Sequence, residues 1–182
     1  MSGAIERRVI TPVPTTEPEI GRWLWALEDT RRRTKERVAG IAQSTIDWTP
    51  DGLANSIGTL LYHIALIEAD YLYVDVLGRT DDIEELQPLL PYPDRDPDGR
   101  LSVVHGITLE EHLHRLDTIR QRLLDTFTSF TMEQKERPRL LPDWGYEISP
   151  AWTLHHLAQH EAEHRGEIGS LRALAEGGPS PA

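Results

Sequence analysis

The sequence predicts an all-α protein, a four-helix bundle in up-down-down-up order with a long crossover between the second and third helices. Three observations favour this fold. Apolar residues repeat at intervals of three and four over four long stretches, and no stretch alternates with the period of a β-strand. The connection at residues 79–107 is also far longer than a tight turn between antiparallel helices.

The first two helices are bounded by residues that favour helix ends. The first is expected over residues 17–40, with Pro18 in its first turn and a glycine at its end. The second is expected to open after Asn55 or Ser56, either of which can cap it, and to run to Leu77 before a glycine.

The third and fourth helices carry clearer start signals. Thr108 and Glu111 have the spacing of a capping box, so the third helix is expected to start there and to end before Pro138. Ser149-Pro150 is a cap followed by a proline at the first helical position, and the fourth helix should end near Gly177.

The connection at residues 79–107 is acidic and is interrupted by prolines. A helix of two dozen residues is about 35 Å long, a distance that the extended connection can retrace. We therefore expect a crossover, and the alternative is a loosely held surface loop. One domain is expected over residues 17–177, between flexible segments at 1–16 and 178–182.

The composition of the chain limits its possible partners, metal ligands and location. The 182 residues suffice for one domain with its own core. The formal net charge of −11 argues against nucleic-acid binding, and without cysteine any metal must be held by nitrogen and oxygen. The start of the chain lacks signal-peptide features, and no apolar run approaches the length that spans a bilayer. We expect a cytoplasmic protein without a membrane partner.

The expected fourth helix contains the strongest candidates for metal ligands. His160 and His164 are four residues apart, so their imidazoles stack on one helix face and can bind a single cation. A third ligand is expected from His63, which lies within an apolar run of the second helix where an imidazole needs a partner. His156 extends the row by one turn and is the alternative third ligand. His155 should face away from the core.

The remaining histidines and the neighbouring glutamates are weaker candidates. His105, His112 and His114 are expected to be structural or solvated. The candidates for a catalytic base or for support of the ligands are Glu161, Glu163 and Glu167, of which only Glu161 falls towards the apolar stripe. Candidate pocket walls are aromatic: Tyr62, Trp144, Tyr146 and Trp152.

Two motifs follow each other along the chain: a helix that opens Asn55-Ser56-Ile57-Gly58 and carries His63, and the ending His164-Arg165-Gly166-Glu167-Ile168 after Trp152, His156 and His160. In this order they resemble the DinB/YfiT-like superfamily of bacterial four-helix-bundle metalloproteins. The resemblance implies an up-down-down-up bundle, frequent homodimers and one divalent metal, such as zinc, nickel or iron, on His63, His160 and His164. It implies no DNA contact. Arg165 matches the motif and could hold a neighbouring carboxylate or form a surface ion pair.

The resemblance also suggests a class of reaction. Relatives include S-transferases that use a low-molecular-weight thiol such as bacillithiol or mycothiol, a thiol-dependent isomerase of maleylpyruvate, and suspected hydrolases. We therefore expect a divalent-metal-dependent enzyme that activates a small thiol for transfer to an electrophile, with a small-molecule substrate. The alternatives are a hydrolase that uses a metal-bound water and a non-catalytic protein that binds a metal or a small ligand.

Overall fold

The computed structural model describes residues 7–52, 55–79, 84–141 and 145–177. Trp144 and the expected tail at 178–182 lie outside these residues, as do residues 1–6 of the expected N-terminal segment. The elements in chain order are α1 (Pro18–Val38), α2 (Gln43–Asp47), α3 (Ile57–Asp70), the π-helix η1 (Tyr71–Val76), the 3-10 turn η2 (Glu84–Leu86), α4 (Leu109–Thr128), α5 (Met132–Glu136), β1 (Arg139–Leu141), β2 (Tyr146–Ile148) and α6 (Pro150–Ala175). Helices dominate this part of the chain, which confirms the all-α prediction.

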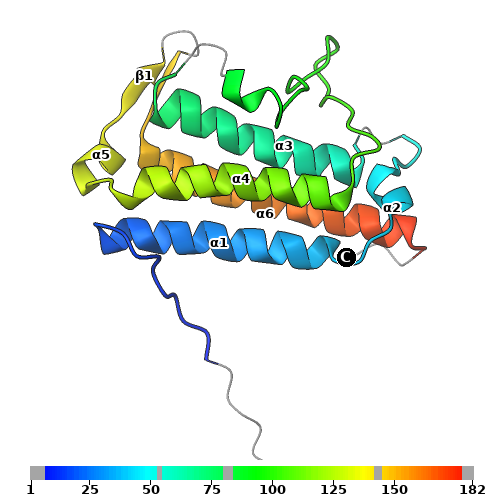
Figure 1. Cartoon of the computed structure of the whole chain (residues 1–182), viewed down its shortest axis with the longest axis horizontal. Coiled ribbons are helices and arrows are strands. Elements are labelled where there is room, and N and C mark those ends of the chain that lie inside the picture. Colours follow the sequence, from blue (N-terminus) through cyan, green and yellow to red (C-terminus); the bar gives the residue numbers. More distant parts are fainter. Residues whose placement is uncertain (1–6, 53–54, 80–83, 142–144, 178–182) are drawn as a thin grey trace, which may run out of the picture.

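Four long helices, α1, α3, α4 and α6, lie side by side and form the body of the molecule (Figure 1). Helix α3 packs against α4 and α6, and α1 packs against the same two helices. The starts of α3, α4 and α6 are capped as predicted, because the side chains of Ser56, Thr108 and Ser149 each accept a hydrogen bond from a backbone N–H of the first turn. Thr108 and Glu111 form the complete capping box.

The structure departs from the predictions in its short elements. The antiparallel hairpin of β1 and β2 was not predicted, because strands of three residues are too short to show alternation. Helices α2 and α5, of five residues each, were also missed. The expected second helix is regular only to Asp70 and continues as η1, before Gly78 with its φ of 70°.

The long connection is anchored to the bundle, so the loosely-held-loop alternative is wrong for its described residues. The hydroxyl of Tyr62 in α3 donates to the backbone oxygen of Tyr92 at 2.7 Å and accepts from the same residue's N–H at 2.8 Å. Arg115 in α4 donates its Nε–H to the backbone oxygen of Leu89 at 2.6 Å. These contacts hold the connection over α3 and α4.

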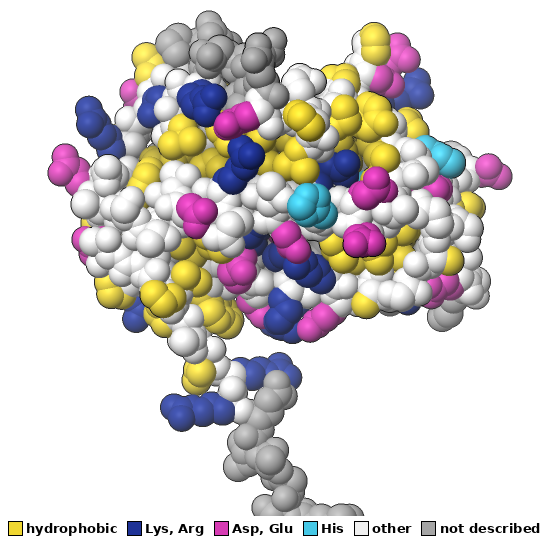
Figure 2. Space-filling view, viewed as in Figure 1, with side chains coloured by type: hydrophobic (Ala, Val, Ile, Leu, Met, Phe, Trp, Pro, Cys, Tyr) yellow, Lys and Arg dark blue, Asp and Glu magenta, His cyan; other side chains and the backbone are white. Residues whose placement is uncertain are grey.

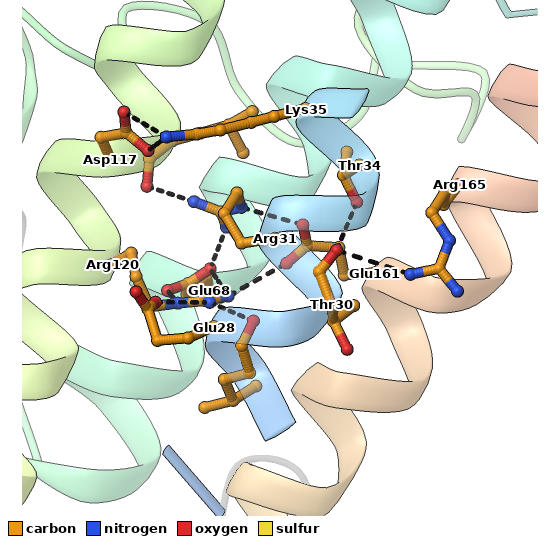
Figure 3. Close-up of polar contacts among 12 residues, drawn as sticks. Glu28, Thr30, Arg31, Thr34, Lys35, Glu68, Asp117, Arg120, Glu161 and Arg165 are labelled. Atoms are coloured by element: carbon orange, nitrogen blue, oxygen red, sulfur yellow. Dashed lines mark hydrogen bonds and ion pairs between the residues drawn. The ribbon is translucent and has the colours of Figure 1, made fainter. Parts of the chain in front are cut away.

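The centre of the bundle is ionic. Arg31, Glu68, Arg120 and Glu161 come one each from α1, α3, α4 and α6, and all four are buried (Figure 3). Arg31 bonds Glu161 at 2.8 Å and Glu68 at 2.6 Å, and Arg120 bonds the same two carboxylates at 3.0 and 2.6 Å. Two cations thus neutralise two anions, and each partner holds one helix against another.

Two apolar clusters flank this ionic centre along the bundle. One contains Leu24, Leu72, Phe127 and Leu154, and the other contains Val38, Ile64, Leu116 and Ile168. On the face shown in Figure 2, basic side chains are interspersed with acidic ones. Within the described residues, no helix combines the length and hydropathy needed to cross a membrane.

Candidate metal centre

The three histidines predicted from the sequence meet in space. The Nε2 atom of His160 lies 3.2 Å from Nε2 of His63 and 3.1 Å from Nε2 of His164. One ligand atom from each of the three side chains lies within 4.8 Å of the other two. His63 comes from α3, whereas His160 and His164 occupy successive turns of α6. The group could therefore hold a metal ion between these two helices.

The outer nitrogens of two of these rings face carboxylates. Nδ1 of His63 lies 3.0 Å from Oδ1 of Asp94, and Nδ1 of His164 lies 3.3 Å from Oε2 of Glu167. An ionised carboxylate only accepts hydrogen bonds, so each Nδ1 carries a proton, and the neutral tautomer with this proton has its lone pair on the inward-facing Nε2. Carboxylates in this position fix the tautomer and orientation of metal-binding histidines.

This arrangement fits a cation better than an empty site. Both lone pairs point at Nε2 of His160, which can donate at most one proton, so at least one close nitrogen pair is left without a hydrogen between them. Nitrogens bound to one cation at about 2.1 Å lie about 3.0–3.4 Å apart in octahedral or tetrahedral geometry. Two of the three spacings, 3.1 and 3.2 Å, agree with this range, and the third nitrogen pair lies within 4.8 Å.

Burial keeps the inner rings neutral. Burial, with repulsion from His164 and His63, lowers the pKa of His160 to about 3. Burial also lowers the pKa of His63, against the opposing attraction of Asp94. Both rings are therefore unprotonated near neutral pH, which is the form that binds a metal.

The alternative ligand His156 lies outside this group. Its ring stacks on Trp152 with centroids 4.7 Å apart and an interplanar angle of 9°, and its centroid is 5.8 Å from that of His160. The other histidines lie elsewhere: His105, His114 and His155 are exposed, and His112 is buried beside Arg115. The structure thus brings together His63 rather than His156 with the α6 pair.

The residues expected to act as a base or to support the ligands have different partners in the structure. Glu167 faces a cluster histidine, but Glu161 points into the ionic centre, where both of its oxygens are bonded by arginines (Figure 3). Burial opposes ionisation of Glu161, yet attraction from Arg31 and Arg120 outweighs it and lowers the pKa of this carboxyl. A carboxylate so held is a poor proton acceptor, which argues against Glu161 as a base. Arg165 donates to the backbone oxygen of Thr30 at 3.5 Å instead of holding a carboxylate.

The aromatic residues expected to line a pocket also differ in their positions. Tyr62 is buried and fastens the long connection, whereas Trp152 is exposed and lines a pocket with Tyr146. Trp144 lies outside the described residues. Asp94 was missed by sequence reasoning, because a single acid in an acidic, proline-rich connection carries no distinguishing signal.

Comparison with known proteins agrees with the fold. The chain resembles a crystal structure titled as a conserved protein of locus from Enterococcus faecalis, with 17% sequence identity, 85% of this chain and 95% of that chain covered, and a TM-score of 0.69. At this identity the likeness shows the fold alone. No curated protein matches the chain. The profile of the DinB superfamily matches residues 26–168, which begin within α1, end within α6 and include all three clustered histidines. The chain therefore belongs to the DinB superfamily.

Proposed function

We propose that the protein binds one divalent metal per chain through His63, His160 and His164 and uses it to activate a small thiol for transfer to an electrophile. The observation that carries the proposal is the convergence of three Nε2 atoms, two of them on rings oriented by carboxylates. Three imidazoles leave coordination positions open, whereas structural zinc sites usually have four protein ligands. Zinc, nickel and iron all suit such a site.

The proposed reaction is based on the histidine cluster and on the absence of cysteine from the chain. A divalent cation held by His63, His160 and His164 would lower the pKa of a thiol bound to it and so favour the thiolate near neutral pH. The chain has no cysteine, so the sulfur nucleophile comes from a low-molecular-weight thiol. In the transfer its sulfur bonds the electrophilic carbon, the leaving group departs with its electron pair, and the thiol proton passes to solvent.

The surroundings support thiol transfer over hydrolysis. A carboxylate base beside a metal-bound water would favour hydrolysis. Glu161, the glutamate nearest the apolar stripe, is already bonded by two arginines. Glu163 is exposed and accepts a hydrogen bond from Gln159. Glu167 faces the outer nitrogen of His164, where it orients a ligand.

We also propose the finer architecture that the family resemblance implies. It comprises one domain over residues 17–177, helices in up-down-down-up order, and a homodimer that acts on a small molecule. The anchored connection between α3 and α4 supports the helix order, because its described part runs over the bundle.

Metal analysis tests the first half of the proposal. Wild-type protein should carry about one divalent metal per chain, and alanine at residue 63, 160 or 164 should each remove most of it. The exposed His114→Ala is the matched control and should keep full occupancy. Full occupancy in His63→Ala would contradict the assignment and point to His156.

A thiol panel tests the second half. Bacillithiol, mycothiol and glutathione are supplied with a generic electrophile to metal-loaded wild type and to His164→Ala. We expect turnover with at least one thiol and its loss in the variant. Equal rates in both proteins for every thiol would contradict the transferase proposal. Hydrolysis without added thiol would instead support a hydrolase.

A further inference from the structure

A second feature of the molecule lies where the β-hairpin meets the start of α6. A pocket of about 650 Å³ opens there between η1, β2 and α6. Three aromatic rings line it, Tyr71, Tyr146 and Trp152, and Tyr146 and Trp152 are 43% and 46% exposed. Exposed rings around a pocket of this size are typical of a ligand site.

Negative charge surrounds these rings. Glu136 and Glu147 line the pocket, and the described lining contains neither lysine nor arginine. Burial raises the pKa of Tyr71 to about 12, and repulsion from Tyr146, Asp75 and Asp70 adds to the shift. Burial and the same two aspartates raise the pKa of Tyr146, so carboxylates lie close to both phenols.

Nearby cations offset only part of this charge. Lys135 pairs with Glu136 at 2.7 Å, and both Arg137 and Arg139 line a neighbouring cavity together with Asp75. Glu147 has no ion-pair or hydrogen-bond partner among the described side chains. The pocket therefore presents partly exposed aromatic rings together with an excess of negative charge. This combination attracts organic cations and repels anions.

A row of rings connects the pocket with the metal centre. Trp152 and Tyr71 both contact His156, with centroids 4.7 and 4.8 Å away, and His156 in turn faces His160 at 5.8 Å. Trp152 and His160 are eight residues apart on α6, which is about 12 Å along a helix. A substrate that reaches from the pocket to the histidine cluster must therefore span about this distance.

We propose that this pocket binds an organic cation, such as an alkylated ammonium group, at the end of the substrate remote from the reacting atom. Contacts with the faces of Tyr71, Tyr146 and Trp152 and attraction by the surrounding carboxylates provide the affinity. The assignment as a substrate subsite rests on the proposed function of the histidine cluster. Cation binding itself does not depend on that function.

Calorimetric titration of the full chain tests the proposal with choline and its uncharged isostere 3,3-dimethylbutan-1-ol. Choline should bind about fivefold more tightly or better, because the two differ in charge and hardly in shape. Trp152→Leu should weaken choline binding to a similar degree, whereas Trp25→Leu, on α1 outside this pocket, should not. Glu147→Gln alters an exposed side chain and should weaken choline binding without disturbing the fold.

Two outcomes would overturn the proposal. One is equal binding of choline and the alcohol. The other combines two results: wild type binds no choline, and light scattering shows a wild-type dimer that the Trp152→Leu substitution dissociates. A second copy of the chain would then cover the pocket. His160→Ala should retain choline binding. If it does and no thiol supports turnover, the proposed function fails while the cation site stands.

Discussion

Asp94 and His63 are 31 residues apart in sequence, yet Oδ1 of Asp94 lies 3.0 Å from Nδ1 of His63. The carboxylate comes from the long connection after α3, and the imidazole comes from α3 itself. The connection therefore supplies a group that orients a candidate metal ligand, in addition to joining two helices.

Removing this carboxylate should weaken metal binding without unfolding the protein. We expect Asp94→Asn to lower metal affinity by about 10- to 100-fold, the usual effect of losing such a partner. Competition with a chromogenic chelator measures the affinity. Asp98→Asn is the matched control, because Asp98 is an exposed acid of the same connection and, among the described residues, its carboxylate pairs with Arg100 alone, at 3.6 Å. Equal affinities of the two variants would refute the orienting role of Asp94.

Metal removal should destabilise the bundle but leave it folded. The apolar clusters and the ionic centre do not include the three histidines, so these interactions persist in the metal-free protein. After treatment with a chelator we expect a lower melting temperature and a helical circular-dichroism spectrum. A random-coil spectrum would show that the metal is needed for folding, as in small zinc domains.

The ionic centre should respond strongly to loss of one partner. Arg120→Met leaves Glu68 and Glu161 buried with Arg31 alone, and we expect the free energy of unfolding to fall by about 3–5 kcal/mol. Arg122→Met, two residues further along α4, removes a partly exposed arginine and should cost less than about 1 kcal/mol. Urea denaturation measures both. Similar losses in the two variants would contradict the central role of Arg120.

His112 should make the fold sensitive to acid. Burial, with repulsion from Arg115, lowers the pKa of His112 to about 4 from an ordinary value of 6.5. Below pH 6.5 the unfolded chain takes up a proton that the folded chain resists, so stability falls as pH drops from 6.5 towards 4. Between pH 7 and 5.5 this group should remove about 1 kcal/mol.

Comparison with His112→Leu isolates this contribution. When the pH is lowered from 7 to 5.5, the free energy of unfolding of wild type should fall by about 1 kcal/mol more than that of His112→Leu. Urea denaturation at the two pH values measures this difference. A difference that stays constant with pH would mean that the pKa of His112 is not lowered in the folded protein.

Much of the fold could be predicted because its signals are local. Caps such as Ser56 and the box of Thr108 with Glu111 act within one helical turn, so spacing alone reveals them. The pairing of His160 with His164 is equally local, because residues four apart share a helix face. His63 was inferred from an imidazole in an apolar run, where it needs a partner.

Only the tertiary structure decided which distant groups meet. Glu161 was a candidate base by sequence, but packing of the four helices gave it two arginine partners. Asp94 became the partner of His63 because the connection folds back over α3, and no local pattern records such a return. Helix periodicity and caps are set by neighbours within a turn, whereas the partner of a buried charge or imidazole is set by how the helices pack.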